Sequence, residues 1–130
     1  SASFIPAVTK VLESFEKQSV DFFSLDIVNL ISSKLANEGI KAFSSGNYED
    51  AETLLKSSYR ANPANIVTNL NLARLLRRRN ANINTIQQHY KIALKNTHER
   101  KYIKLIKREI ILFEKAENQI LEINPIQLRF

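Results

Sequence analysis

The stretch LANEGIKAFSSGNYEDAETLLKSSYRANPAN, residues 35–65, decides the fold, because a weaker copy of it follows 34 residues further along the chain. The copy reads NLARLLRRRN at residues 71–80 and continues as INTIQQHYKIAL at residues 83–94. Gly46 corresponds to Asn80 at this offset, and beyond Asn80 the offset is 35. A fixed period of this length indicates a repeated pair of helices, which usually forms a binding surface and not a site of chemistry.

The composition is that of one ordinary globular domain. The chain has 130 residues, of which 44% are hydrophobic and 25% charged, as is usual for a soluble fold. Two glycines and three prolines allow few breaks, so we expect long helices. The lack of cysteine excludes disulfides, thiol catalysis and cysteine-based zinc sites. No signal-peptide pattern and no long apolar run occurs, so we expect a cytoplasmic domain. Because the chain has no methionine, we interpret it as a piece of a larger protein.

The net charge of +6 is concentrated in the second half of the chain. Residues 1–65 carry six basic and eight acidic side chains, whereas residues 66–130 carry thirteen and five. Between residues 74 and 108 there are eleven basic residues and one acid, Glu99. Such a density repels itself unless it is offset, so it favours an anionic partner or an acidic neighbouring domain.

The spacing of apolar residues predicts helices and no strand. The expected helices cover residues 6–18, 24–45, 47–62, 65–79, 84–96 (or from 82) and 97–123. Gly46 is expected to end one of them in a left-handed conformation, and Pro63 and Pro125 to follow the ends of two others. The side chains expected to cap helix N-termini are Ser24, Asn47, Asn65, Asn82 or Asn84, and Thr97.

The last predicted helix has an apolar stripe at heptad spacing. The stripe consists of Ile103, Ile106, Ile110, Phe113 and Ile120, and Glu117 interrupts it. We favour a helix that covers the open end of the repeat array, because terminal repeats need a cap. The alternative is a dimerising coiled coil, for which three interrupted heptads are thin support.

Residues 32–65 resemble a tetratricopeptide repeat. The family's small residue, its Gly-Asn-Tyr turn, its helix-contact alanine and its terminal proline are present as Gly39, residues 46–48, Ala51 and Pro63, while Ser58 replaces a usual alanine. Residues 66–99 are a weaker copy that lacks the glycine and the proline. The resemblance implies an all-α fold of antiparallel helix pairs in a short right-handed solenoid with a long C-terminal capping helix. Its expected parts are residues 1–23 (helix and connection), 24–63 and 65–96 (repeats), 97–123 (capping helix) and 124–130 (tail).

In this family the first helix of each pair lines a concave groove. The positions that face it correspond to Ser33, Ala36, Ile40 and Phe43, then Val67, Leu70, Arg74 and Arg77, and on the capping helix Tyr102, Leu105, Glu109 and Leu112. The resemblance thus implies a groove that is apolar on one side and lined by arginine on the other. One subclass grips the C-terminal carboxylate of chaperones with a Lys and an Asn, but Ala36 and Ile40 stand there. Asn71 matches an asparagine in the second repeat of that subclass, but this single match does not place the chain in it.

No pattern of catalytic or metal-binding residues is found. His89 and His98 are not spaced as a pair of ligands on one helix face, so we interpret both as surface residues. No Gly-rich phosphate loop and no nucleophile motif occurs. We therefore expect a domain that is not an enzyme, with no catalytic residue, cofactor or metal.

The expected function is that of a non-catalytic scaffold that binds a protein segment or docks a neighbouring domain. The alternative is a basic accessory module for a membrane surface, an anionic polymer or nucleic acid, within a larger, glycosyltransferase-like enzyme. Tyr102 is the sole aromatic residue among the basic ones, which disfavours nucleic acid. The expected partner-binding residues are Arg74, Arg77, Arg78, Ile40, Phe43, Leu70, Asn71, Lys101, Tyr102, Lys104 and Arg108. We expect Arg74, Arg77 and Arg78 to form part of a free basic surface, so their exchange for glutamate should weaken association with a partner or a membrane and leave stability nearly unchanged. Nothing in the sequence indicates the oligomeric state.

Overall fold

The chain is built from helices, as the sequence predicts. The computed structural model describes residues 4–17, 25–115 and 123–130, and these ranges contain six helices and no strand. The helices are α1 (Phe4–Lys17), α2 (Leu25–Ser44), α3 (Tyr48–Ala61), α4 (Ile66–Arg78), α5 (Ile83–Asn96) and α6 (Arg100–Lys115). The predicted all-α class is confirmed.

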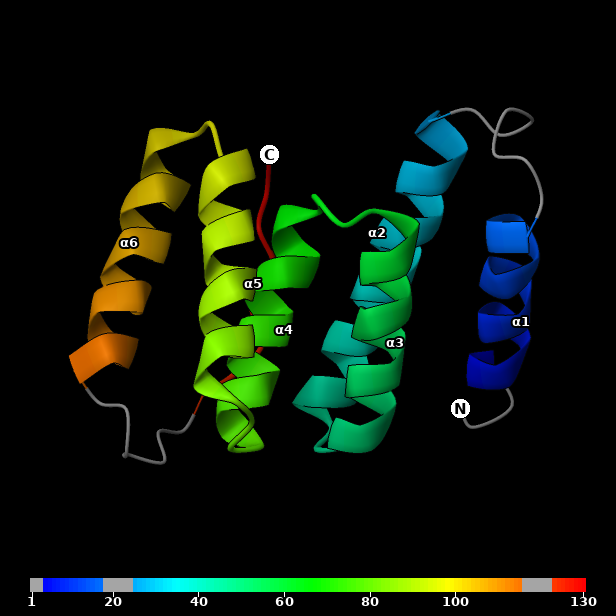
Figure 1. The fold of residues 1–130 in the computed structure, drawn as a ribbon, viewed down its shortest axis with the longest axis horizontal. Helices are drawn as coiled ribbons and strands as arrows, with labels where there is room; N and C mark the ends of the chain where they lie inside the picture. The colour runs from blue at the N-terminus through cyan, green and yellow to red at the C-terminus, as the bar shows by residue number, and fades with distance from the viewer. Residues whose placement is uncertain (1–3, 18–24, 116–122) are drawn as a thin grey trace.

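The helices form an elongated array with α1 at one end and α6 at the other, in which α2 lies behind α3 in the view of Figure 1 and also contacts α4. The closest pairs are α2 with α3 and α4 with α5, which are the two predicted repeats. Helix α1 lies against α3 at one end of the array, and α6 lies against α5 at the other. The predicted bounds of α2 to α5 are met within two residues. The last helix begins at Arg100 and not at residue 97, and Ile123, which was expected in its final turn, is not helical.

Most of the predicted helix ends have the expected chemistry. Gly46 has a φ of 81°, the left-handed conformation that ends α2. The side chains of Asn65 and Asn82 cap α4 and α5 by accepting hydrogen bonds from backbone N–H groups. Asn47 occupies the N-cap position of α3, but its side chain makes no capping bond. The prediction for Thr97 is wrong, because its hydroxyl donates back to a carbonyl of α5 and α6 starts three residues later. Ser24 lies outside the described residues.

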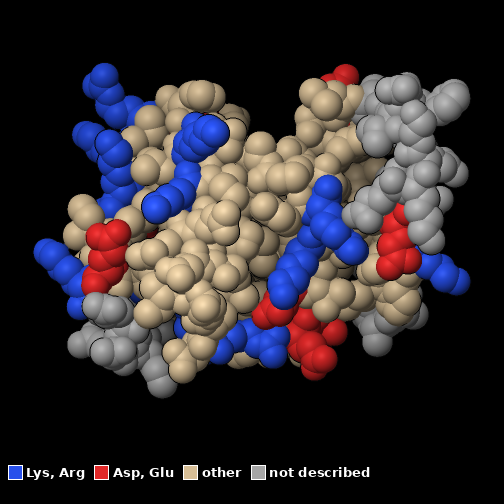
Figure 2. Space-filling view, in the orientation of Figure 1, with Lys and Arg blue, Asp and Glu red and all other residues tan. Residues whose placement is uncertain are grey.

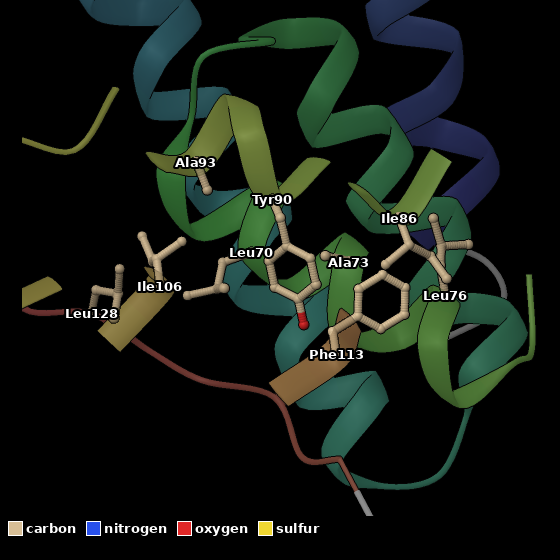
Figure 3. Packing of buried hydrophobic residues seen from close by; sticks show 9 residues of the cluster. All are labelled: Leu70, Ala73, Leu76, Ile86, Tyr90, Ala93, Ile106, Phe113 and Leu128. Atoms are coloured by element: carbon tan, nitrogen blue, oxygen red, sulfur yellow. The ribbon is translucent and has the colours of Figure 1, made fainter. Parts of the chain in front are cut away.

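The core consists of three clusters that follow the order of the helices. The cluster at the C-terminal end joins α4, α5, α6 and the segment after α6 (Figure 3), and contains Leu70, Ala73, Leu76, Ile86, Tyr90, Ala93, Ile106, Phe113 and Leu128. The central cluster contains Phe43, Ala51, Leu55, Leu72 and Leu75. The third, which holds α1, contains Leu12, Leu35 and Leu54. Full burial of each large apolar side chain stabilises the fold by about 1.5–3 kcal/mol.

Helix α6 closes the array with the stripe that the sequence singled out. Ile106 and Phe113 are buried in the C-terminal cluster and Ile110 packs against it. Ile111 and Leu112, on the outer side, are half exposed. The stripe thus covers this chain's own array, as the capping interpretation requires. Ile120 and Glu117 lie outside the described residues.

Hydroxyl groups meet where α2, α3 and α4 come together. The Ser58 hydroxyl donates to the carbonyl oxygen of Ser32 at 2.7 Å and lies 2.6 Å from the Thr68 hydroxyl oxygen. The Ser32 hydroxyl donates to the carbonyl oxygen of Ser58 at 2.9 Å. All three residues are fully buried. Serine at position 58 is therefore part of a polar contact that an alanine could not make.

Candidate functional site

Residues 123–130, here called the C-terminal segment, run along α4 on the side that faces α6 (Figure 1). The Asn71 side chain binds both backbone groups of Ile126: its amide donates to the carbonyl oxygen at 2.7 Å, and its oxygen accepts from the N–H at 2.8 Å. From α6, the Tyr102 hydroxyl accepts from the N–H of Arg129 at 2.7 Å and donates to the carbonyl oxygen of the same residue. The backbone of the segment is thus held from two helices.

Two arginines of α4 bind the beginning of the C-terminal segment. Arg78 donates to the carbonyl oxygen of Ile123 at 3.2 Å, and Arg74 to that of Asn124 at 2.9 Å. Arg78 and Asn71 lie seven residues apart on α4, roughly 10 Å at 1.5 Å per residue. Their partners on the segment are three residues apart, about 3.5 Å each, which is the length of extended chain. The segment is therefore extended and antiparallel to α4.

Apolar side chains of the C-terminal segment join the core. Leu128 is 6% exposed and belongs to the same cluster as Leu70 and Ile106; in Figure 3 it lies beside Ile106, with Leu70 beyond. Ile126 packs against this cluster from its edge. Phe130 remains exposed, with its ring centroid 5.2 Å from that of Tyr102. Leu128 is thus the principal apolar anchor of the segment.

A charged network beneath the segment joins α4, α5 and α6. Arg74 donates through Nε to both carboxylate oxygens of Glu109 at 3.0 Å, and its Nη2 also contacts this carboxylate. Tyr90 donates to the same carboxylate at 2.7 Å and accepts from Arg77 at 2.9 Å. Burial, and then the nearby charge of Glu109, raise the pKa of Tyr90 above its usual value. Because Arg74 also binds Asn124, this network fixes a contact of the segment.

The predicted arginines therefore make contacts within the domain. The guanidinium of Arg77 lies 4.9 Å from the ring centre of Phe113, and that of Arg78 lies 5.0 Å from the ring centre of Tyr48. The side chain of Arg74 is only 16% exposed. The structure does not place these three side chains as one solvated patch.

The predicted basic residues of α6 are arranged differently. Lys101, Lys104 and Arg108 are exposed, and Lys and Arg side chains line the α6 edge in Figure 2. The ammonium of Lys101 lies 3.7 Å from the carboxylate of Glu99 and 4.8 Å from the ring centre of Tyr102. The exposed basic residues among the predicted site residues thus lie on α6.

The apolar residues predicted to bind a partner are mostly core. Phe43 is 3% exposed and Leu70 is fully buried, while Ile40 is partly exposed. Phe43 also meets the edge of the Tyr48 ring, at 5.8 Å between centroids. Of the eleven predicted site residues, the structure brings Arg74, Arg78, Leu70, Asn71 and Tyr102 together around the C-terminal segment.

A cavity of about 370 Å³ lies between the C-terminal segment and α2. The segment forms one wall, in which the Gln127 side chain donates to the Asn37 side chain at 3.2 Å. The opposite walls are Ser33, Ala36, Asn37, Asn62, Ala64, Asn65, Ile66 and Val67. The groove between α2 and α4 is therefore not filled by the segment.

A second cavity, of about 500 Å³, reaches the other face of the array and is lined in part by His89, Lys56 and Tyr59. His89 is partly buried, with its Nδ1 2.9 Å from the side-chain oxygen of Asn69. Burial, and then the charge of Lys56, lower the pKa of His89. His89 is thus only partly exposed, whereas His98 is exposed. Among the described residues, no group of three potential metal ligands occurs.

The C-terminal segment is the part of the site that the sequence interpretation missed. From the sequence, only a tail is predicted at residues 124–130, although Ile126, Leu128 and Phe130 alternate with polar residues. Such alternation is typical of an extended chain with one buried face. The sequence also contained an indication of the ion pair between Arg74 and Glu109. The two residues are 35 apart and occupy equivalent positions of successive copies.

Comparisons with protein-family models, with curated proteins and with solved structures find no match to this chain. Within the ranges that the structure describes, none of the helices combines the length and the apolar character needed to cross a membrane.

Proposed function

We propose that the domain is a non-catalytic, cytoplasmic scaffold of tetratricopeptide type that binds an extended segment of polypeptide between α2, α4 and α6. The observation that carries the proposal is the C-terminal segment itself. It lies in this groove as an extended chain, and the side chains of Asn71, Arg74, Arg78 and Tyr102 bind its backbone.

The contacts are suited to a polypeptide ligand because most of them go to backbone groups. The Asn71 amide satisfies one N–H and one C=O of the same residue, as a neighbouring strand would. Glu109 also holds the side chain of Arg74, so little further side-chain freedom is lost when Arg74 donates to a carbonyl. Two of the residues that bind the backbone, Arg74 and Tyr102, also stand at positions that the family resemblance assigns to the groove, as does Leu70 of the cluster that contains Leu128.

The test uses a labelled peptide with the sequence of residues 123–130, blocked at both ends to remove the terminal charges. Fluorescence anisotropy measures its binding to the full chain carrying Leu128→Asp, in which the resident segment loses its apolar anchor. We expect saturable binding that the further change Asn71→Ala abolishes. Absence of saturable binding to the folded variant contradicts the proposal.

The exposed basic residues of α6 support a second candidate function, an anion-binding accessory module. Arg100, Lys101, Lys104, Lys107 and Arg108 are all exposed, and Arg100, Lys104 and Arg108 follow one another at intervals of four, which places them along one face. Clusters of this size bind anionic lipid surfaces or polyanions.

Sedimentation with vesicles of phosphatidylcholine, with and without phosphatidylserine, tests this second function. Exchange of Lys101, Lys104 and Arg108 for glutamate should abolish binding to the anionic vesicles, and salt should weaken binding of the parent chain. The matched control exchanges three exposed lysines of α1 and α2, Lys10, Lys34 and Lys41. Equal loss in both variants would show a general charge effect and no α6 site.

A further inference from the structure

We infer that the groove's partner is an extended segment with apolar side chains at alternate positions and an aromatic, hydroxyl-bearing side chain between them, and that this partner displaces residues 123–130. The inference rests on the proposed function and adds to it the chemistry of the ligand and the identity of its competitor. Its evidence is how the C-terminal segment fills one part of the groove and leaves another part empty.

The alternation follows from the side chains that the segment buries. Ile126 and Leu128 are two residues apart and both contact the C-terminal core cluster, whereas Gln127 and Arg129 are exposed. In an extended chain, side chains two residues apart share one face. A partner segment that fills the same two apolar sites must therefore also carry apolar side chains two residues apart. A segment with a charged residue at the position of Leu128 should not bind.

The aromatic residue follows from the cavity next to Gln127. This cavity of about 370 Å³ has apolar walls from Ala36, Ile66 and Val67, and amide groups from Asn37 and Asn65 at its side. Gln127 lines it and bonds only to its rim, at Asn37. A tyrosine ring would occupy apolar space that the glutamine leaves empty, and its hydroxyl would have amide partners.

The segment is built as a displaceable occupant. Only Leu128 of its eight residues is buried, and the bonds made by Arg129 and Gln127 are exposed to solvent. The segment is nevertheless joined covalently to α6 through residues 116–122, so its effective concentration at the groove reaches the millimolar range for a short linker. A free peptide with the same contacts must overcome this advantage, which makes the segment a competitor.

The experiment measures binding of blocked, labelled peptides to full chains by fluorescence anisotropy. The probes are the peptide of residues 123–130, the same peptide with Gln127→Tyr, and the same peptide with Leu128→Asp. The chains are the parent, the variant Leu128→Asp, and the control variant Asn124→Asp, which places the same charge on an exposed side chain of the same segment. Far-UV circular dichroism and thermal melting establish that each variant is folded, and Leu128→Ser replaces Leu128→Asp if that variant is not.

We expect the unmodified peptide to bind Leu128→Asp at least tenfold more tightly than it binds the parent or Asn124→Asp. The Gln127→Tyr peptide should bind at least threefold more tightly than the unmodified one, and the Leu128→Asp peptide should not bind. Equal affinity for the parent and Leu128→Asp chains would overturn the role of the segment as competitor. Equal affinity of the tyrosine and glutamine peptides would overturn the assignment of the cavity. Both results leave the proposed function standing, whereas failure of every peptide to bind the folded Leu128→Asp chain overturns it as well.

Discussion

Asn80 takes, at the end of α4, the left-handed backbone conformation that Gly46 takes at the end of α2. The φ angles are 57° and 81°. The same hydrogen bond accompanies both: the N–H of Gly46 donates to the carbonyl oxygen of Phe43 and that of Asn80 to Arg77, each at 3.1 Å. Asparagine is the residue that most readily replaces glycine in this conformation. The second copy therefore keeps the turn of the first although it lacks the glycine.

This equivalence predicts opposite effects for two substitutions at Asn80. Asn80→Ala should lower the free energy of unfolding by about 1 kcal/mol, because the Cβ of alanine is strained at positive φ and no side-chain dipole compensates. Asn80→Gly should leave stability unchanged or raise it. Urea unfolding followed by circular dichroism measures both. A variant with alanine that is as stable as the one with glycine would contradict the assignment of the turn.

Ser58→Ala is predicted to destabilise the fold, even though alanine is the residue that the family resemblance favours there. The substitution leaves the buried hydroxyl of Thr68 without its partner at 2.6 Å. An unsatisfied buried polar group costs about 1–3 kcal/mol. Urea midpoints compare this variant with Ser44→Ala at an exposed position of α2, which should stay within about 0.5 kcal/mol of the parent. A double variant, Ser58→Ala with Thr68→Val, should recover part of the loss.

Ala51→Phe should overpack the contact between α3 and its neighbours. Ala51 is fully buried in the central cluster with Phe43, Leu55, Leu72 and Leu75. Added volume at such a position costs about 1–3 kcal/mol. Thermal melting should show the loss, whereas Ala7→Phe at an exposed position of α1 should not. An unchanged midpoint for Ala51→Phe would refute the close contact at this position.

Arg74→Glu should destabilise the domain, contrary to the expectation from sequence that the arginines form a free surface. The change places a carboxylate against Glu109, whose side chain is 13% exposed. Breaking a buried pair costs about 3–5 kcal/mol, and partial exposure lowers this to roughly 2 kcal/mol. Arg100→Glu, at an exposed position, is the control. If the double exchange Arg74→Glu with Glu109→Arg restores none of the lost stability, loss of this ion pair is not the cause of the destabilisation.

The pKa of His89 predicts a loss of stability in mild acid. Its folded pKa lies below the usual value of 6.5, because burial and Lys56 disfavour the charged ring. The unfolded chain therefore binds a proton first as the pH falls, so the contribution of His89 is present above pH 6.5 and declines below it. Between neutral and mildly acidic pH, the free energy of unfolding measured in urea should fall less in His89→Gln than in the parent. The control, Gln88→Ala at an exposed position of the same helix, should retain the full pH dependence.

The helices could be predicted from sequence because their signals are local. The periodicity of apolar residues and the residues at helix ends fixed the bounds of α2 to α5 within two residues. The site could not be predicted in the same way, because the number of charges along the chain does not show which charged groups meet in the fold. Eleven basic residues between 74 and 108 suggested one cationic surface, but Glu109 and the carbonyl groups of Ile123 and Asn124 engage two of the arginines. Those partners come from beyond the counted window, and only the tertiary structure brings them near.

Under the proposed function, occupation of the groove by residues 123–130 makes the stability of the fold and the binding of a partner compete for the same contacts. Each contact that seats Leu128 or Ile126 adds to the free energy of unfolding of the chain, and the same contact must be given up before a partner can enter. A substitution that tightens the segment therefore yields a more robust but less receptive domain, and one that loosens it does the reverse. Under selection for both properties, this part of the sequence is expected to settle at an intermediate strength of self-binding.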